Sequence, residues 1–203
     1  MRKLITFFVF FCLLYQPNYA AYLRAELNVK DEHRVNNRDG GFCMWCCLEM
    51  LLLACGYEEG KGLTHDRYET RYFVKTSRGF EELPKNGAAK VKDLVSELIR
   101  RRIPYEEQYY KDVSIIKKAC NANGGAILLL NGWPVTGEGH GILITGYDAE
   151  SVTFIDPNKA YQPGKENPAP YYTVSWKWVS YYWTGHVVTV RPNQKQVEVI
   201  SNR

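Results

Sequence analysis

The chain has 203 residues, of which 45% are hydrophobic and 14% aromatic, and its net charge is +4. This length and apolar content suffice for one packed core and exclude a disordered chain. A net charge this small is not typical of proteins that bind DNA or RNA, which gather basic residues into a strongly positive patch. We therefore expect one globular domain that does not act on nucleic acid.

The first 20 residues have the pattern of a secretory signal peptide. Arg2 and Lys3 form a positive start, residues 4–15 are predominantly apolar, and Ala20 and Ala21 offer small residues for cleavage. The apolar stretch is too short to span a bilayer comfortably. The sequence therefore predicts a signal peptide over residues 1–20, a single mature domain over residues 21–203, and a secreted or periplasmic protein. An uncleaved signal anchor remains an alternative and would be the only contact with a membrane.

The cysteine count points to a free thiol. The sequence holds six cysteines, and Cys12 would leave with the signal peptide, so five would remain. In an oxidising compartment an odd number leaves at least one thiol unpaired, and an unpaired thiol in an exported protein invites a reactive role. The five are Cys43, Cys46, Cys47, Cys55 and Cys120.

Three helices are predicted in the first two thirds of the chain. Apolar residues recur at helical spacing over residues 44–55, and Gly56 ends the run. A second apolar stripe starts at Val91 and ends in the arginine run 100–102, where cations favour a helix C-terminus. A third helix begins after Asp112 as N-cap.

Beyond these helices the period changes to that of strands. Short apolar or alternating runs lie between Gly, Pro, Asn and Asp turns at residues 126–130, 140–147, 151–155, 171–176 and 187–190. Helices followed by strands are typical of the α+β class, so we expect helices on one side of an antiparallel sheet.

Cys43 stands where a cysteine becomes a nucleophile. The thiolate is the reactive form, and the N–H groups at a helix start and a nearby imidazolium both favour it. Cys43 directly precedes the apolar run 44–55 and lies in the first turn of the predicted helix. We therefore expect it to be the most reactive thiol of the chain.

His140 and Asp156 supply the other two groups of a nucleophilic site. His140 lies between Gly139 and Gly141 at the start of one predicted strand, and Asp156 follows the next. Neighbouring antiparallel strands bring the end of the second to the start of the first, so the carboxylate would lie beside the imidazole. A carboxylate there holds a histidine in the tautomer and direction that the nucleophile requires.

These residues resemble the papain-like cysteine peptidases, and among them most closely the bacteriocin-processing branch, which cleaves after double-glycine leaders. That branch has a cysteine opening a long helix that ends in glycine, as from Cys43 to Gly56. It then has a histidine opening a strand and an Asp-Pro pair one hairpin later, here His140 and Asp156-Pro157. It also has an amide residue six positions before the cysteine, where this chain has Asn37.

The resemblance implies a fold, an activity and a set of roles. The fold would place the nucleophile at the start of a central helix, in an N-terminal helical part packed on a C-terminal antiparallel sheet. The activity would be hydrolysis of a peptide or protein through an acyl-enzyme on Cys43. His140 would act as base and acid, Asp156 would orient it, and Asn37 would bind the oxyanion. No cofactor or metal ion is implied.

The same residues fit other interpretations. Cys43 and Cys46 are spaced as Cys-x-x-Cys, as in papain itself, where the second cysteine is the nucleophile; however, Gly40 then stands six positions ahead and offers no side chain to an oxyanion. An NlpC-type cell-wall amidase, a transglutaminase-like acyl transferase and an inactive binding protein with paired cysteines are the competing functions. The oligomeric state is not predicted.

Overall fold

The computed structural model describes residues 25–37, 42–69, 72–76, 79–83, 89–131, 139–158 and 169–194. The predicted signal peptide, residues 1–20, lies outside these ranges. Within them no helix combines the length and the apolar character that crossing a bilayer requires.

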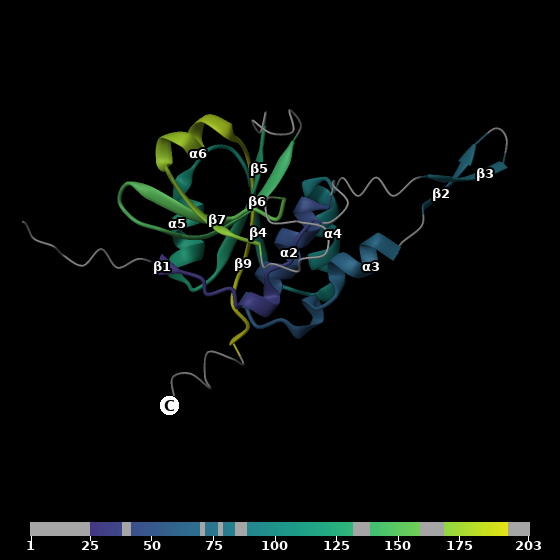
Figure 1. The fold of residues 1–203 in the computed structure, drawn as a ribbon, viewed down its shortest axis with the longest axis horizontal. Coiled ribbons are helices and arrows are strands. Elements are labelled where there is room, and N and C mark those ends of the chain that lie inside the picture. Colours follow the sequence, from purple (N-terminus) through teal and green to yellow (C-terminus); the bar gives the residue numbers. More distant parts are fainter. Residues whose placement is uncertain are drawn as a thin grey trace, which may run out of the picture.

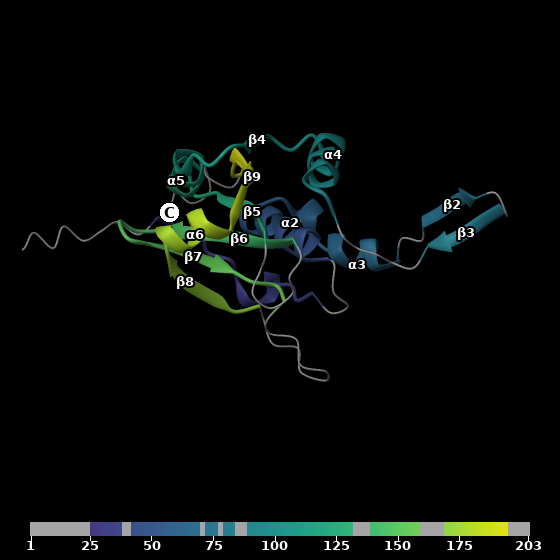
Figure 2. The same ribbon diagram turned by 90° about the horizontal axis from the view of Figure 1, so that it is seen from above.

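Antiparallel pairing organises the centre of the molecule (Figure 1). Among the described residues seven strands form one sheet in the order β4-β9-β5-β6-β7-β8, and β1 also pairs with β6. A separate hairpin joins β2 and β3 and extends away from this sheet (Figures 1 and 2). The strand bounds are β1 Ala25–Glu26, β2 Tyr72–Thr76, β3 Gly79–Leu83, β4 Tyr105–Tyr109, β5 Gly125–Leu130, β6 His140–Tyr147, β7 Ser151–Ile155, β8 Tyr171–Ser175 and β9 Trp183–Val190.

Helix α2 (Cys43–Ala54) packs on one face of the sheet together with α4 (Val91–Arg101). Its residues are apolar all round, apart from Glu49, and they are buried from Cys43 to Leu53. A helix that is apolar on every side has to be enclosed, and here the sheet, α4 and the segments before and after α2 enclose it. The surrounding short helices are η1 (Asp31–His33), η2 (Glu58–Gly60) and α3 (Leu63–Glu69).

The opposite face of the sheet is covered by α5 (Val113–Asn121) and α6 (Trp176–Tyr182). Successive residues of a strand point to opposite faces, and β5 shows this: Ile127 joins the core around α2, whereas Ala126 and Leu128 join the core under α5. Both faces of the strands are apolar, so both have to be covered. This two-sided arrangement corrects the expectation that the helices lie on one side of the sheet.

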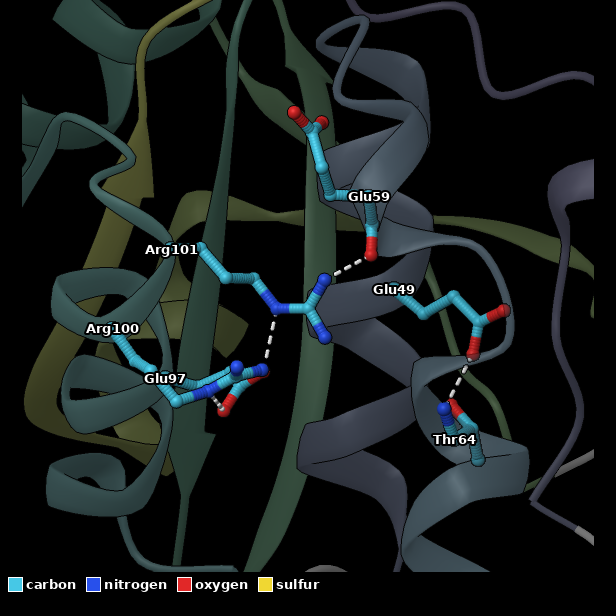
Figure 3. A network of polar contacts seen from close by, with 6 residues as sticks. All are labelled: Glu49, Glu59, Thr64, Glu97, Arg100 and Arg101. Atoms are coloured by element: carbon cyan, nitrogen blue, oxygen red, sulfur yellow. Dashed lines mark hydrogen bonds and ion pairs between the residues drawn. The ribbon is translucent and has the colours of Figure 1, made fainter.

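Buried carboxylates fix the helices around α2 (Figure 3). Glu49 of α2 accepts the backbone N–H of Gly62 at 2.8 Å and of Thr64 at 2.7 Å, and so holds the start of α3. Glu97 of α4 accepts hydrogen bonds from Arg100 and Arg101, the cations predicted for this helix end. Arg101 also donates to the carbonyl of Glu59 in η2. Glu49 thus ties α2 to the start of α3, and Arg101 ties α4 to η2.

The α+β class and the predicted helices are confirmed. Asp112 caps α5 by accepting the N–H of Ser114 at 2.9 Å, and Gly56 follows α2 with a φ of 83°, a left-handed conformation that suits glycine. The predicted strands are confirmed with two changes. Strand β8 ends at Ser175, one residue before its predicted end at Trp176, where α6 begins, and β9 begins at Trp183 rather than at Val187.

Candidate active site

Cys43 is the first residue of α2, and its side chain meets the start of β6. The backbone N–H of Gly141 donates to Cys43 Sγ at 3.3 Å. An N–H aimed at sulfur and the N-terminal end of a helix both favour a thiolate over a thiol. The close approach requires glycine, because a Cβ at position 141 would lie 3.2 Å from Met44 Cα and would contact the Met44 side chain.

His140 and Asp156 lie side by side, as the hairpin predicts. Strands β6 and β7 pair with Leu143 opposite Ile155, so the residues before Leu143 lie level with those after Ile155. His140 Nε2 and Asp156 Oδ1 are 2.9 Å apart, and both side chains are almost completely buried. Because a carboxylate only accepts, Nε2 carries the hydrogen and Nδ1 remains for Cys43.

The environment of His140 favours its charged form. Burial lowers the pKa of His140, but hydrogen bonds to Asp156 and to Cys43, together with the negative charges of these two groups, outweigh burial and raise the pKa from 6.5 to about 9. An imidazolium next to a cysteine activates that cysteine as a nucleophile.

Asn37 lies in the same group of side chains. Its backbone N–H donates to the carbonyl of Pro157 at 2.9 Å, and the residue is 5% exposed. Asn37 Oδ1 accepts the backbone N–H of Phe42, the residue before Cys43, at 3.3 Å. Asn37 Nδ2 donates to Asn158 Oδ1 at 2.6 Å. All four residues predicted for the site are thus brought together.

Asn158 is a member of the site that the sequence did not reveal. Its side-chain Nδ2 lies 3.2 Å from His140 Nδ1, and its backbone N–H donates to Asp156 Oδ1 at 2.9 Å. In the sequence Asn158 reads as part of an Asp-Pro-Asn turn, and the backbone bond to Asp156 is such a turn. Its contacts to Asn37 and His140 depend on tertiary structure.

The other cysteines belong to the core. All five cysteines within the described residues are free thiols. Burial, followed by the nearby charge of Cys43, raises the pKa values of Cys46 and Cys47 well above the ordinary thiol range. Burial likewise raises the pKa values of Cys55 and Cys120 to about 12. These four thiols stay protonated, whereas Cys43 borders the histidine.

A metal site of cysteines finds no support in the part of the chain that the structure describes. No group of three or more His, Cys, Asp or Glu side chains there is arranged to hold a metal ion. The cysteines of α2 instead pack among leucines and methionines of the core.

By sequence, no family model and no curated protein matches this chain. By structure it resembles three solved peptidases at low sequence identity. The first is a double-glycine motif protease from an AMS/PCAT transporter, crystallised with its leader peptide. Its TM-score is 0.52 at 13% sequence identity, and the match covers 83% of this chain and 94% of that chain. The second is the peptidase domain of the ABC transporter ComA from Streptococcus: TM-score 0.51, 11% identity, coverage 77% and 96%. The third is a protein from Bacillus anthracis described as a C39-like peptidase: TM-score 0.54, 14% identity, coverage 84% and 98%.

These likenesses extend over most of this chain and nearly all of each neighbour. They show that the chain has the papain-like α+β fold. Within that class its fold is that of the C39 double-glycine peptidase domains, so the resemblance noted in the sequence is confirmed at the level of the fold.

Proposed function

We propose that the chain is a cysteine peptidase that hydrolyses peptide bonds through an acyl-enzyme on Cys43. One observation carries the proposal: Cys43 opens α2 against the N–H of Gly141 and beside a histidine whose second nitrogen is bonded to Asp156. These three side chains match the nucleophile, base and orienting carboxylate of a catalytic triad, which supports the proposal.

The reaction follows from the positions of the atoms. The Cys43 thiolate attacks the carbonyl carbon, and the negative charge moves to the carbonyl oxygen, for which the Cys43 backbone N–H and the Asn37 amide are the proposed donors. As the C–N bond breaks, His140 gives its Nδ1 proton to the leaving amine. The neutral ring then takes a proton from water, whose oxygen attacks the thioester and releases the acid.

A peptide or protein is the proposed substrate. The structural neighbour that was crystallised with a leader peptide supports this class, since it shares the fold over most of its length. The reaction as written involves the peptide, water, and side chains and backbone of this chain.

The structure bears on two of the competing functions. The free thiols do not favour an inactive binding protein whose cysteines are paired. An NlpC-type amidase usually completes its site with a second histidine, whereas Asp156 stands in that place here. A transglutaminase-like acyl transferase would share the same three side chains and differ only in the group that accepts the acyl chain.

The test uses a mixture of unfolded proteins, incubated with the mature chain under reducing conditions and scanned by mass spectrometry for new termini. The native chain should create new termini, Cys43→Ala should lower the rate roughly a thousand-fold or more, and Cys46→Ala should remain active. A folded Cys43→Ala variant that still cleaves would contradict the proposal. With a primary amine added, amide products in place of new carboxyl termini would indicate an acyl transferase instead.

A further inference from the structure

We propose that Asn158 is a positioning residue that holds the neutral form of His140 with its hydrogen on Nε2, through a chain of amide hydrogen bonds that starts at the backbone of α2. The importance of this role for turnover rests on the proposed function. These hydrogen bonds link three pairs of atoms. Phe42 N and Asn37 Oδ1 are 3.3 Å apart, Asn37 Nδ2 and Asn158 Oδ1 are 2.6 Å apart, and Asn158 Nδ2 and His140 Nδ1 are 3.2 Å apart.

The hydrogen bond at Phe42 fixes which atom donates and which accepts in each of these bonds. The N–H of Phe42 can only donate, so the oxygen of Asn37 has to face it and the nitrogen of Asn37 faces Asn158. The oxygen of Asn158 is thereby turned to Asn37 and its nitrogen to His140. Turning either amide around would set two N–H groups or two oxygens against each other.

At His140 the last hydrogen bond meets an acceptor, as this order requires. His140 Nε2 gives its hydrogen to Asp156, so Nδ1 of the neutral ring has a lone pair that accepts the N–H of Asn158. A protonated Nδ1 has no lone pair and could not accept it. Asn158 therefore stabilises the neutral ring and opposes the groups that stabilise the charged one.

Four titratable groups near His140 and Asp156 affect the balance between the charged and neutral forms of the ring. Cys43 from α2 and Asp156 after β7 bond to His140 and favour its charged form. Cys47 from α2 and Tyr172 from β8 lie near enough to Asp156 for its charge to raise their pKa values, after the larger effect of burial, so both stay neutral around pH 7. Asn158 is thus the neutral donor among groups that otherwise favour the imidazolium.

A peptidase cycle needs both the charged and the neutral form of the His140 ring. A group that stabilises the neutral form against the others therefore contributes to the cycle. The charged ring sustains the thiolate and protonates the leaving amine, whereas the neutral ring has to accept a proton from water. A donor on Nδ1 keeps the neutral ring in the tautomer whose lone pair is on Nδ1, and this hydrogen bond breaks when Nδ1 takes the proton from water. It also keeps the pKa of His140 from rising further.

The test is a pH titration of the His140 ring by NMR, with histidine labelled with ¹⁵N in the mature chain and His140→Gln used to assign its signals. In the native chain the deprotonated ring should carry its hydrogen on Nε2. Asn158→Leu removes the donor at similar volume and should raise the pKa of His140 by roughly 0.5 to 1 unit. Asn158→Asp presents an oxygen to Nδ1, still accepts from Asn37, and should raise it by roughly 1 to 2 units.

Asn121→Asp is the matched control. Asn121 lies at the end of α5 and accepts the hydroxyl of Tyr147 at 2.8 Å, so aspartate keeps that bond and adds the same charge away from His140. The control should leave the His140 titration unchanged. Asn158→Leu is the decisive variant, because a carboxylate at position 158 raises the pKa of His140 by its charge alone. Should Asn158→Leu fail to fold, the position of the hydrogen on the neutral native ring tests the inference.

A pKa of His140 that stays equal or falls in the folded Asn158 variants, or a neutral native ring with its hydrogen on Nδ1, would overturn the inference. The titration requires no turnover, so it is read apart from peptide cleavage. Absence of cleavage by the native chain would contradict the proposed function alone, whereas cleavage with unshifted titrations would contradict only the role of Asn158.

Discussion

At the scale of single residues, Asp156 combines a structural and an electrostatic role. Its Oδ1 accepts both the backbone N–H of Asn158, which shapes the turn, and the Nε2–H of His140. An aspartate before Pro157 suits an ordinary turn, and it also suits a partner of the histidine. The structure places both on one oxygen atom, so substitutions have to separate the charge from the turn.

The pH dependence of turnover separates them. The pKa of His140 is raised from 6.5 to about 9, so the native rate should fall as the pH rises through about 9, where the imidazolium that protonates the leaving amine is lost. Asp156→Asn keeps an oxygen for the turn but removes the charge, so this fall should move to lower pH, with a lower rate overall. Asp156→Ala should abolish most of the activity.

Asp148→Asn provides the matched control for this prediction. Asp148 Oδ1 accepts the N–H of Glu150 at 2.9 Å in the turn between β6 and β7, which is the same local bond without a histidine. This variant should keep the native pH profile. If Asp156→Asn and Asp148→Asn changed thermal stability alike and left the profile alone, Asp156 would be a turn residue only.

At the scale of elements, the contact between α2 and β6 sets the distance from nucleophile to base. Gly141→Ala should push a Cβ against Met44, lower the free energy of unfolding by about 1–3 kcal/mol, and slow alkylation of Cys43 because the helix start moves away from His140. Gly139→Ala, two positions earlier, should change little, since its Cβ would make only ordinary contacts, with Leu129 Cδ1 at 3.6 Å and the Leu130 carbonyl oxygen at 3.8 Å. Chemical denaturation and thiol alkylation measure the two effects.

Equal behaviour of the two alanine variants would contradict a close contact at Gly141. Loss of stability with unchanged alkylation per folded molecule would show that the contact supports the core but does not set the position of the thiol.

The elements that the sequence revealed are those with a clear period. Helix α2 and strand β6 follow from repeating apolar positions, and the site follows because Cys43 and His140 open these two elements. Helix α6 was missed because its aromatic residues favour strands; the local signal was Ser175, whose side chain accepts the N–H of Trp178. Asn158 was missed because its partner Asn37 is 121 positions away.

At the scale of the whole molecule, both faces of the sheet are covered, and the site lies where α2 meets the strands. The strand runs of the sequence do show apolar residues at successive positions, as in residues 126–130, which is the signal of a sheet buried on both faces. The side on which each helix packs depends on the order of strands in the sheet. That order comes from long-range pairing, which a local pattern does not contain.

Thiol counting tests the export prediction and the state of the cysteines together. We expect the exported chain to begin at Ala21, to have lost Cys12, and to show five thiols after denaturation without reductant. In the native state one thiol should react fast, because burial keeps the other four protonated. Intact mass and thiol titration measure this. Fewer than five thiols would indicate disulfides and favour a binding protein.

The central claim is that Cys43 is an activated nucleophile, and mapped alkylation tests it most directly. The native chain is treated with iodoacetamide from pH 5 to pH 9, the modified cysteine is identified by peptide mass spectrometry, and its rate is followed against pH. We predict modification of Cys43 first, already fast below pH 7, and a large loss of this low-pH reactivity in His140→Gln. Preferential modification of Cys46, or slow labelling that rises only above pH 8 as for an ordinary thiol, would contradict the account.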